Sequence, residues 1–372
     1  MAGPLHGLCV IEMAGIGPCP LAGQLLADLG ADVVVIDRAS GDADPTDINR
    51  RGKRSVALNL KADEGRKIAR DLINTAGIMI EGFRPGVMER LGLGPDDLGD
   101  HVILGRMTGW GQTGPLAQTA GHDINYLSIT GALGAMGNPG EASPPPLNLI
   151  GDYGGGTMFL IFGLFSAMFE RDRSGKGQVV DVAMSDGVTA MMGLIHTGYA
   201  RQDWGLDRAS NLLDGGAPFY RTYKTADDRR VSVGPLEPQF FAELIDGMGL
   251  PEAERLTQMD RASWPEKHRL YEAIFARKTR AEWEEVFAGS DACVAPVLKF
   301  DEVLENPHNK ARNTYVAPGG VLQSAPAPRF SRSGENAVSA PTGPGAQTDE
   351  ILQKLGFDAD AIAGLRADKV LT

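Results

Sequence analysis

Cysteine is scarce in this chain of 372 residues, which contains only Cys9, Cys19 and Cys293. None of the three belongs to a C-x-x-C pair, so a structural zinc site is not expected, and we predict no metal site. An odd, small number of cysteines is typical of a protein from a reducing compartment. This scarcity favours a cytoplasmic location.

Positive charge is also in deficit. The chain has 36 Lys and Arg against 48 Asp and Glu, for a formal net charge of −12. A nucleic-acid partner is excluded, because neutralising phosphates needs a basic surface. An anionic ligand would need a local basic pocket instead of a global field.

Targeting signals and long apolar runs are missing as well. The longest apolar run, Met158–Phe169, is interrupted by Gly163, and we interpret it as a buried helix too short to cross a bilayer. No basic, apolar and small-residue order marks a signal peptide at the start, and Lys369–Thr372 is not a peroxisomal signal. We therefore expect a cytoplasmic protein without membrane insertion.

Alternating strand and helix patterns fill the first hundred residues. The chain is long enough for two domains, and its hydrophobic content of 42% is ordinary for a globular protein. The alternation predicts a largely parallel sheet with helices on both faces. The predicted strands are Leu8–Glu12, Asp32–Ile36, Val56–Leu60, Ile78–Ile80 and Val102–Leu104, and the predicted helices are Pro18–Leu29 and Glu64–Thr75.

A second, smaller α+β domain is predicted over residues 222–316. Its hairpin strands flank Ala226-Asp227-Asp228, and three helical stretches follow. The predicted domains are a large one in 1–185, a linker in 186–221, the small one in 222–316, and a return arm with the rest of the large domain in 317–372. The elements are strands Phe219–Tyr223 and Arg230–Val233, helices Pro238–Met248, Trp264–Ala276 and Arg280–Phe287, an irregular arm over Ala317–Gln347, and a helix Thr348–Leu355 packing on the first domain.

Arginines near strand ends are candidates for phosphate binding. Gly15-Ile16-Gly17 after the first strand is half of a dinucleotide fingerprint, but a tight strand-to-helix turn is the simpler interpretation. Arg38 follows the second strand, where an arginine can pair with a phosphate on an adenosine ribose, such as that of coenzyme A. Arg84 lies between turn residues after another strand. The alternative for both is a solvated surface charge, and Arg51, Lys53, Arg54, Lys61 and Arg90 have weaker claims of the same kind.

Two titratable groups beside glycines carry the sharpest chemical hypothesis. His122 follows Gly121, and Asp152 precedes Tyr153 and three glycines. On opposite faces of one carbon, the two groups would remove a proton and return one. The alternatives are a loop histidine bonded to its neighbours and a helix-capping aspartate. Glu237, between two prolines, is either a functional acid or a first-turn helix acid.

Several motifs together carry a family resemblance over nearly the whole chain. They are Glu12–Pro18, Leu29–Val34, Glu81–Val87, Met107–Pro115, Gly121–Tyr126, Gly151–Gly156, Ser174–Asp181 and Leu213–Pro218. In these segments the chain resembles the α-methylacyl-CoA racemases of the family III CoA-transferase superfamily. The resemblance implies a large Rossmann-like CoA-binding domain, a smaller α+β domain, and an interlocked homodimer in which the large domain of one chain meets the small domain of the other.

The resemblance also implies the site. His122 and Asp152 would be the two bases of a 1,1-proton transfer on a 2-methylacyl-CoA thioester through an enolate, with Glu237 supporting His122. No separate cofactor is implied, since coenzyme A enters as part of the substrate. The implied CoA contacts are Arg38, Leu58, Asn59, Leu60, Lys61, Gly82, Phe83, Arg84, Arg90, Gly121, Asp123, Ile124, Asn125 and Tyr126.

The main alternative is a CoA-transferase of the same superfamily. The resemblance implies that such relatives use an aspartate at the position of Asp152 as a nucleophile and generally lack the histidine at 122. The presence of His122 favours the racemase, an isomerase of branched-chain lipid metabolism. For the racemase we further expect the enolate oxygen to be held by backbone N–H groups near Asp123 and Asp152 to be partly buried with a raised pKa.

Overall fold

The computed structural model describes residues 3–334 and 338–372. By their contacts the described residues form two compact units. The first unit comprises residues up to Thr130, Pro146–Met191 and the segment from Pro307 to Thr372, and the second comprises Gly131–Pro145 and Met192–Asn306. Each unit is described separately.

The first unit is built on a six-stranded sheet of order β3-β2-β1-β4-β5-β6, in which every neighbouring pair is parallel. This confirms the predicted α/β class. The third strand begins two residues earlier than predicted, and the sixth was not predicted. The strands are β1 (Cys9–Met13), β2 (Asp32–Asp37), β3 (Arg54–Ala57), β4 (Ile78–Glu81), β5 (Ile103–Thr108) and β6 (Val179–Ala183).

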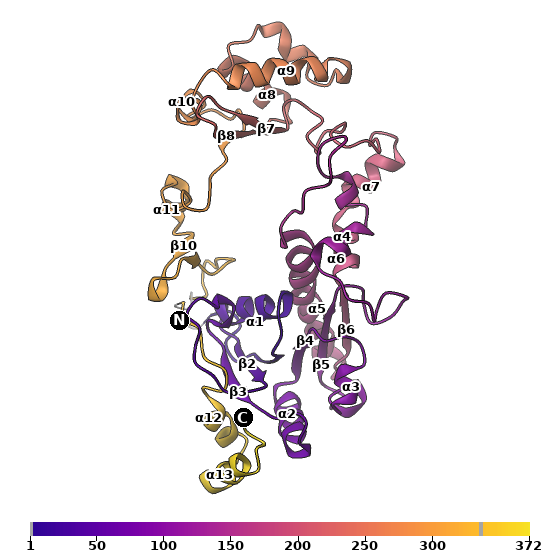
Figure 1. Ribbon diagram of the computed structural model, residues 1–372, viewed down its shortest axis with the longest axis vertical. Coiled ribbons are helices and arrows are strands. Elements are labelled where there is room, and N and C mark those ends of the chain that lie inside the picture. The colour runs from indigo at the N-terminus through magenta and orange to yellow at the C-terminus, as the bar shows by residue number, and fades with distance from the viewer. Residues whose placement is uncertain (1–2, 335–337) are drawn as a thin grey trace. The chain divides into compact units, whose positions relative to one another are not determined.

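Helices cover both faces of this sheet because alternate strand residues point to opposite sides. On one face, Ile11 and Val34 pack with α2 (Asp63–Ala76) and α12 (Thr348–Lys354). On the other face, Val10 and Val33 pack with α1 (Pro18–Asp28) and α5 (Phe159–Ser174). In Figure 1 the yellow helix α12 lies beside β3, and α13 (Ala359–Ala367) lies next to α12. The predicted packing of the last helix on the first domain is confirmed, whereas α13 was not predicted.

The carboxyl ends of the parallel strands meet at one edge of the sheet. The strand order reverses between β1 and β4, and this switch point is where doubly wound sheets bind ligands. Gly17, with φ +76°, ends the β1–α1 loop and precedes Pro18, the first residue of α1. The tight strand-to-helix turn predicted for Gly15–Gly17 and the helix start at Pro18 are both confirmed.

A wide helical segment, η4 (Leu149–Met158), has π-helical hydrogen bonding and continues into α5. The helix therefore begins at Leu149, well before the three glycines that we expected to precede it. Those glycines serve helix packing. A Cβ on Gly155 would lie 2.6 Å from the Met184 carbonyl oxygen, and one on Gly187 would lie 2.0 Å from the Gly155 carbonyl oxygen. The close approach lets α6 (Met184–Met191) lie against η4.

The η4–α5 segment is only partly buried. Among the described residues, Leu149–Ser174 is the one helix whose length and composition would suit a membrane span, and only 33% of its apolar window is buried. Phe162 and Phe169 are 70% and 66% exposed. The expectation of a buried helix over Met158–Phe169 is therefore wrong for the single chain, in which Leu160 and Leu164 are buried but Met158, Phe162 and Phe169 are exposed.

The arm returning from the second unit lies along β3. Arg51 donates to the Gln323 side chain and the Ser324 carbonyl, and Thr348 accepts from the Ala57 N–H. Residues 335–337 of the predicted irregular arm lie outside the described part. The remaining elements of this unit are α3 (Val87–Arg90), α4 (Asp123–Ser128), α11 (Pro307–Arg312), and the hairpin of β10 (Tyr315–Val316) and β11 (Gln323–Ser324).

The second unit has an antiparallel sheet of order β7-β8-β9 with an aromatic core that includes Phe219, Tyr271 and Trp283. The predicted hairpin and its three helices are confirmed. Contacts divide the predicted linker of 186–221, with 186–191 in the first unit and 192–221 in this one, and they place 307–316, predicted in the small domain, in the first unit. Arg208 ties the segment from 192 on to Gly134. The elements are α7 (Gly193–Ala200), β7 (Arg221–Lys224), β8 (Arg230–Val233), α8 (Pro238–Gly247), α9 (Trp264–Phe275), α10 (Arg280–Val286) and β9 (Val294–Pro296).

Candidate active site

A cavity of about 440 Å³ opens at the carboxyl edge of the sheet, next to the switch point. The loops after β1, β4 and β5 form its walls, the start of α4 contributes His122 and Tyr126, and η4 contributes Asp152. The lining residues are Ile16–Cys19, Gly82–Pro85, Met107–Trp110, Ala117, Thr119–His122, Tyr126, Asp152 and Met184. His122 and Asp152, 30 positions apart by sequence number, thus line one cavity.

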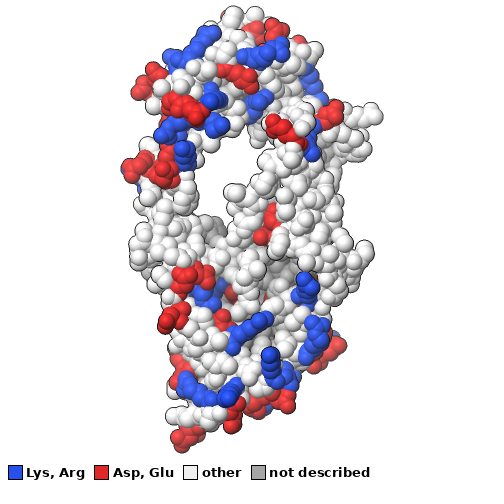
Figure 2. All heavy atoms as spheres, in the orientation of Figure 1, with Lys and Arg blue, Asp and Glu red and all other residues white. Residues whose placement is uncertain are grey.

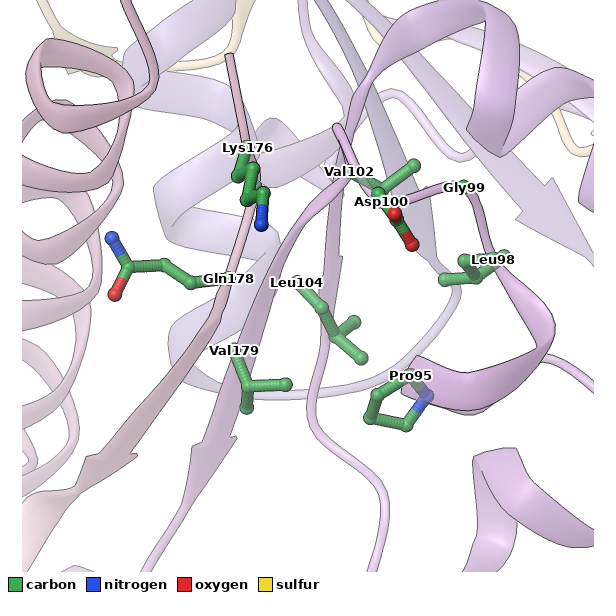
Figure 3. Close-up of a pocket in the computed structure, with 10 residues that line it drawn as sticks. Pro95, Leu98, Gly99, Asp100, Val102, Leu104, Lys176, Gln178 and Val179 are labelled. Carbon is green, nitrogen blue, oxygen red and sulfur yellow. The ribbon is translucent and has the colours of Figure 1, made fainter. Parts of the chain in front are cut away.

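A second hollow, of about 370 Å³, lies at the opposite edge, where β5 and β6 begin. Figure 3 shows its lining from the loop before β5, from β5 and from the start of β6. Asp100 and Lys176 are its only charged lining residues, and it contains none of the predicted site residues. The carboxyl-edge cavity is therefore the candidate active site.

His122 lies at the start of a short helix and is exposed to solvent. It is the N-cap residue of α4, with extended backbone angles of φ −134° and ψ 174°. The Asn125 side chain accepts from the His122 N–H, while the His122 carbonyl accepts from the Asn125 and Tyr126 N–H groups. These bonds fix the His122 backbone where the side chain enters the cavity.

Asp152 lies inside η4 and is partly buried, so it is not a helix cap. Burial raises its pKa above the ordinary value, and the neighbouring Asp123 carboxylate raises it further. A hydrogen bond from Asn148 and the charge of His122 act in the opposite direction, but the net direction is upward. The predicted partial burial and raised pKa of Asp152 are confirmed.

Aromatic side chains brace the histidine loop. The Tyr126 ring meets the Trp110 ring edge to face at 4.8 Å, and its hydroxyl donates to the Gly121 carbonyl. A Cβ on Gly109 would lie 2.0 Å from the Tyr126 ring. Burial and the nearby Asp152 carboxylate raise the Tyr126 pKa. This close packing holds the Gly121–Tyr126 loop against the end of β5.

The cationic candidates separate into two groups. Arg84 lines the cavity, whereas Arg38 and Lys61 follow β2 and β3 at the same edge and Arg90 ends α3. All four side chains are exposed, and none forms a salt bridge with another described residue. They remain available to an anionic ligand.

Three other cations belong to the fold, which corrects their grouping with phosphate ligands. Arg51 is buried against Asp28 at 2.6 Å, and Lys53 is buried against Glu12 at 2.6 Å. Arg54, at the amino end of β3, pairs with Asp32 and Glu350. Arg51 and Lys53 precede β3 and Arg54 begins it, so none of the three lies at the carboxyl edge, and they neutralise carboxylates within the first unit.

The stretch after β3 is tied to the C-terminus. Leu58 is buried in the sheet core and forms a bridge with Leu371. The Asn59 side chain donates to the Lys369 carbonyl, and Lys61 is exposed. A contact of Leu58 with coenzyme A could use only its backbone. The roles assigned to Leu58, Asn59, Leu60 and Lys61 stay predictions.

A buried ion pair supports the loop after β4. Arg106 donates to Glu81 at 2.9 Å and to Glu89 at 2.6 Å, and the Glu81 carboxylate accepts from the Phe83 N–H at 2.6 Å. Burial raises the Glu81 pKa, and the Phe83 and Arg106 donors counter it. The network fixes the Gly82–Arg84 turn beside the cavity.

The remaining predicted residues lie around this loop or in the second unit. Asp123 is buried in the first turn of α4, and Ile124 and Asn125 are exposed. Glu237 is exposed and is the N-cap residue of α8 in the second unit, so its pairing with His122 stays a prediction. Within the described residues, no group of three or more His, Cys, Asp or Glu is arranged to hold a metal ion.

Sequence reasoning did not assign several lining residues to the site. These residues lie at the carboxyl ends of three strands: Ile16–Cys19 after β1, Met107–Trp110 at the end of β5, and Met184 directly after β6. The first two segments follow strands that the sequence does predict, so their positions after those strands were the available signal. Met184 follows β6, which was not predicted, and the sequence marked it only as one of a group of methionines that could contact an acyl tail or, more simply, fill the core.

Comparison with known proteins adds a family and close relatives. The sequence model of CoA-transferase family III matches residues 5–347. The chain is 43% identical to the α-methylacyl-CoA racemase of Mus musculus and 40% identical to that of Homo sapiens, each over 99% of this chain and 97% of the relative. A crystal structure of a CaiB/BaiF family protein from Brucella suis superposes with a TM-score of 0.80 and 25% identity, covering 95% of this chain and all of that one.

Proposed function

Because the chain belongs to CoA-transferase family III, we propose that it is an α-methylacyl-CoA racemase, an isomerase that interconverts the (2R) and (2S) forms of 2-methylacyl-CoA thioesters. The observation that carries this proposal is the shared cavity of His122 and Asp152. Two different titratable groups in one cavity suit a reaction that removes a proton and returns another. The identity to two curated racemases along nearly the whole chain supports the same activity.

The reaction is a 1,1-proton transfer. The thioester carbonyl acidifies the adjacent C2–H bond. For one enantiomer, the His122 imidazole takes the C2 proton, and the electron pair of that bond moves into the carbonyl to form an enolate. The protonated Asp152 carboxyl then delivers its proton to C2 on the opposite face, and the electron pair returns to re-form the thioester. For the other enantiomer the two groups exchange roles.

The electrostatics of the cavity suit the part assigned to Asp152. An aspartate with its ordinary pKa is a weak base and is almost never protonated near neutral pH. Burial and Asp123 raise the Asp152 pKa, which increases both its basicity and the fraction of enzyme that carries the proton to be delivered. His122 lines the same cavity and is exposed to solvent.

Backbone N–H groups at the start of α4 are the proposed partners of the enolate oxygen. The Asn125 and Tyr126 N–H groups are bonded to the His122 carbonyl. The N–H groups of Asp123 and Ile124, one and two positions after the N-cap, have no intrahelical acceptor in such a turn. Glu237 is proposed to orient His122. As the family resemblance implies, this glutamate would come from the small domain of the partner chain.

Coenzyme A is proposed to lie along the carboxyl edge. Arg84 in the cavity, with Arg38, Lys61 and Arg90 farther along the edge, provides exposed cations for phosphates. Because the protein has a net charge of −12, an anionic ligand would depend on these few cations and not on the overall charge. Figure 2 shows acidic and basic side chains mixed on the visible face. Charge-assisted bonds to phosphate are the strong class of hydrogen bond.

A homodimer is proposed on the exposed apolar surface. Met158, Phe162 and Phe169 on η4 and α5 and Met191 on α6 are about half exposed or more. Such a surface marks an interaction site in a protein without membrane insertion. We propose that the dimer works in the cytoplasm on branched-chain acyl-CoA in lipid metabolism, with no cofactor besides the coenzyme A of the substrate.

Deuterium wash-in tests the activity. Each enantiomer of a 2-methylacyl-CoA is incubated with the protein in deuterated water, and C2 is followed by mass spectrometry and chiral analysis. Both enantiomers are expected to gain deuterium at C2 and to equilibrate. The double variant His122→Ala, Asp152→Ala is expected to lose exchange, while Asp96→Asn, which removes an exposed charge at the other edge of the sheet, keeps it. Parental exchange in the double variant would contradict the mechanism.

A CoA-transferase is the second candidate, and the family itself favours it. In that reaction the Asp152 carboxylate would attack the thioester carbonyl and expel the CoA thiolate, forming a mixed anhydride. The thiolate would then attack the Asp152 carbonyl, releasing the donor acid and leaving a CoA thioester on Asp152. The free acid would take the coenzyme A by the same two steps in reverse, which restores the Asp152 carboxylate. The two activities separate when an acyl-CoA is mixed with a free carboxylic acid. Formation of the new thioester with retained C2 configuration supports transfer. Exchange at C2 without a new thioester supports racemisation.

A further inference from the structure

The buried side chain of Asp123 contacts the turn that carries Asp152. We propose that Asp123 is a positioning residue for proton transfer, because its carboxylate holds this turn and presents a negative charge to the Asp152 carboxyl. The inference rests on the proposed racemase function and assigns the Asp123 side chain a part separate from coenzyme A binding. Three observations on the carboxylate carry it.

The first contact is a hydrogen bond between two elements that are distant in sequence. The Asp152 N–H donates to Asp123 Oδ2 at 2.7 Å, across 29 residues. Asp123 begins α4 and Asp152 lies in η4. A wide π-type turn has a weaker internal hydrogen-bond pattern than an α-helix and is frequent at functional sites. The Asp123 carboxylate, by accepting from the Asp152 N–H, therefore fixes η4 at a point where its helical hydrogen bonding is of the wide π type.

The second observation is the glycine that makes room for this bond. A Cβ on Gly151 would lie 2.4 Å from Asp123 Oδ2 and 2.8 Å from Asp123 Cγ. Any side chain at position 151 would displace the carboxylate from the Asp152 N–H. Gly151 is also buried, so the backbone has no free space into which it could move aside.

The third observation is the other oxygen of Asp123. Oδ1 is buried and has no hydrogen-bond partner in the described part of the chain, and the residue is 8% exposed. A buried carboxylate normally has a cation or several donors. With only one donor, the charge of Asp123 is poorly compensated and acts on the nearest carboxyl. Correspondingly, Asp123 is the second cause, after burial, that raises the Asp152 pKa.

The groups that face Asp152 are few. Of the elements packed against η4, α4 and its N-cap contribute His122, Asp123 and Tyr126, α1 contributes the buried Cys19, and α6 contributes Asp186, which is exposed. The charged residues of the other three are Arg106 of β5, paired with Glu81 and Glu89, Asp181 of β6, which accepts from the Gln112 N–H, and those of the last turns of α5, from Glu170 on. The β1–α1 loop contributes only backbone at Gly17, whose Cβ position is 3.9 Å from Asp152 Oδ2. Within this set Asp123 is the carboxylate that raises the Asp152 pKa.

The sign of the effect is the same in both reaction directions. When Asp152 is the base, exchange falls as pH drops below its pKa. When Asp152 is the acid, exchange falls as pH rises above its pKa. Removing the Asp123 charge lowers the Asp152 pKa, so either limb moves to lower pH.

The experiment compares Asp123→Asn with Asp123→Ala. An asparagine keeps an oxygen that can accept the Asp152 N–H and removes the charge, whereas alanine removes both. The kcat and kcat/KM of C2 deuterium exchange are measured against pH for the enantiomer whose exchange survives in His122→Ala, since Asp152 deprotonates that one. Asp96→Asn is the matched control for loss of a negative charge.

In Asp123→Asn the acidic limb is expected to move to lower pH, with no movement in Asp96→Asn. In Asp123→Ala the same movement is expected, with a kcat on the order of 10- to 100-fold below that of Asp123→Asn, because the Asp152 turn is no longer held. An unmoved limb in Asp123→Asn, or an equal kcat in the two variants, overturns the inference. Absence of exchange in the parent would instead overturn the proposed function.

Discussion

Arg51 and Lys53 are enclosed by the fold with Asp28 and Glu12, while Arg38 and Arg84 are exposed at the carboxyl edge. Removing one partner of a buried pair leaves an uncompensated charge and lowers the free energy of unfolding by about 3–5 kcal/mol, so the enclosed cations are committed to their carboxylates. An exposed arginine without an ion-pair partner can bind a phosphate without breaking an existing ion pair. Residue by residue, burial and pairing therefore decide which cations can serve a ligand.

Arg38 provides a test at this scale. Arg38→Met is expected to raise the KM for a 2-methylacyl-CoA by about 10-fold or more, the value of one charge-assisted hydrogen bond, with little change in kcat. With a substrate that lacks the phosphate on the adenosine ribose, parent and variant should have similar KM values. The measurement is steady-state racemisation with both substrates.

The matched control for Arg38 is Arg54→Met, which removes an equal charge from the amino end of β3, where Asp32 and Glu350 already pair with it. It should leave the ratio of the two KM values unchanged. An Arg38→Met variant that still discriminates the two substrates as the parent does would remove Arg38 from the phosphate site.

Among the elements, the contact between η4 and α6 has the closest bearing on catalysis. Gly155 and Gly187 bring two helices so near that backbone meets backbone. The segment that carries Asp152 is thus backed by α6 on one side and held by Asp123 on another. The position of the Asp152 carboxyl depends on both supports.

Gly187→Ala tests the support from α6. The added methyl would lie 2.0 Å from the Gly155 carbonyl oxygen, so the helices must separate. We expect the free energy of unfolding in urea to fall by about 1–3 kcal/mol, the usual cost of overpacking, and kcat to fall with it. Gly364→Ala in α13 is the control, because no atom lies within 4 Å of its Cβ position. It should leave kcat unchanged and stabilise the helix by up to about 1 kcal/mol.

Sequence periodicity predicts the elements of both units well because most have one clearly apolar face. β1, β2, α1 and α2 fall within two residues of their predicted bounds. β6 was missed because Val179 and Val180 lie at an edge and are only partly covered. The start of η4 was missed because Gly151 and Gly154–Gly156 are typical of a loop by propensity, and only the tertiary contact with α6 makes a helix favourable there. The two titratable groups were identified from their chemistry and family resemblance, whereas the Asp123 contact depends on η4 and was not predictable.

For the whole molecule, the catalytic proposal joins residues from both units. His122 and Asp152 belong to the first unit, and Glu237 belongs to the second. The exposed apolar side chains of η4, α5 and α6 favour a second copy of the chain as the partner of that surface. If the partner chain supplies Glu237, then each complete site needs two chains, and activity becomes a property of the dimer.

Mixed dimers test this sharing of residues. His122→Ala and Glu237→Ala chains carrying different tags are co-expressed, and the mixed dimer is isolated through both tags. If Glu237 acts across the dimer, one site lacks both side chains and the other retains both, so the mixed dimer should recover about half of the parental activity, while either variant alone stays low. The matched control pairs His122→Ala with Asp152→Ala. Both residues line one cavity of the same unit, so no site in that mixed dimer is complete and activity should not return. Equal, low activity in the two mixed dimers would mean that Glu237 acts within its own chain or does not support His122.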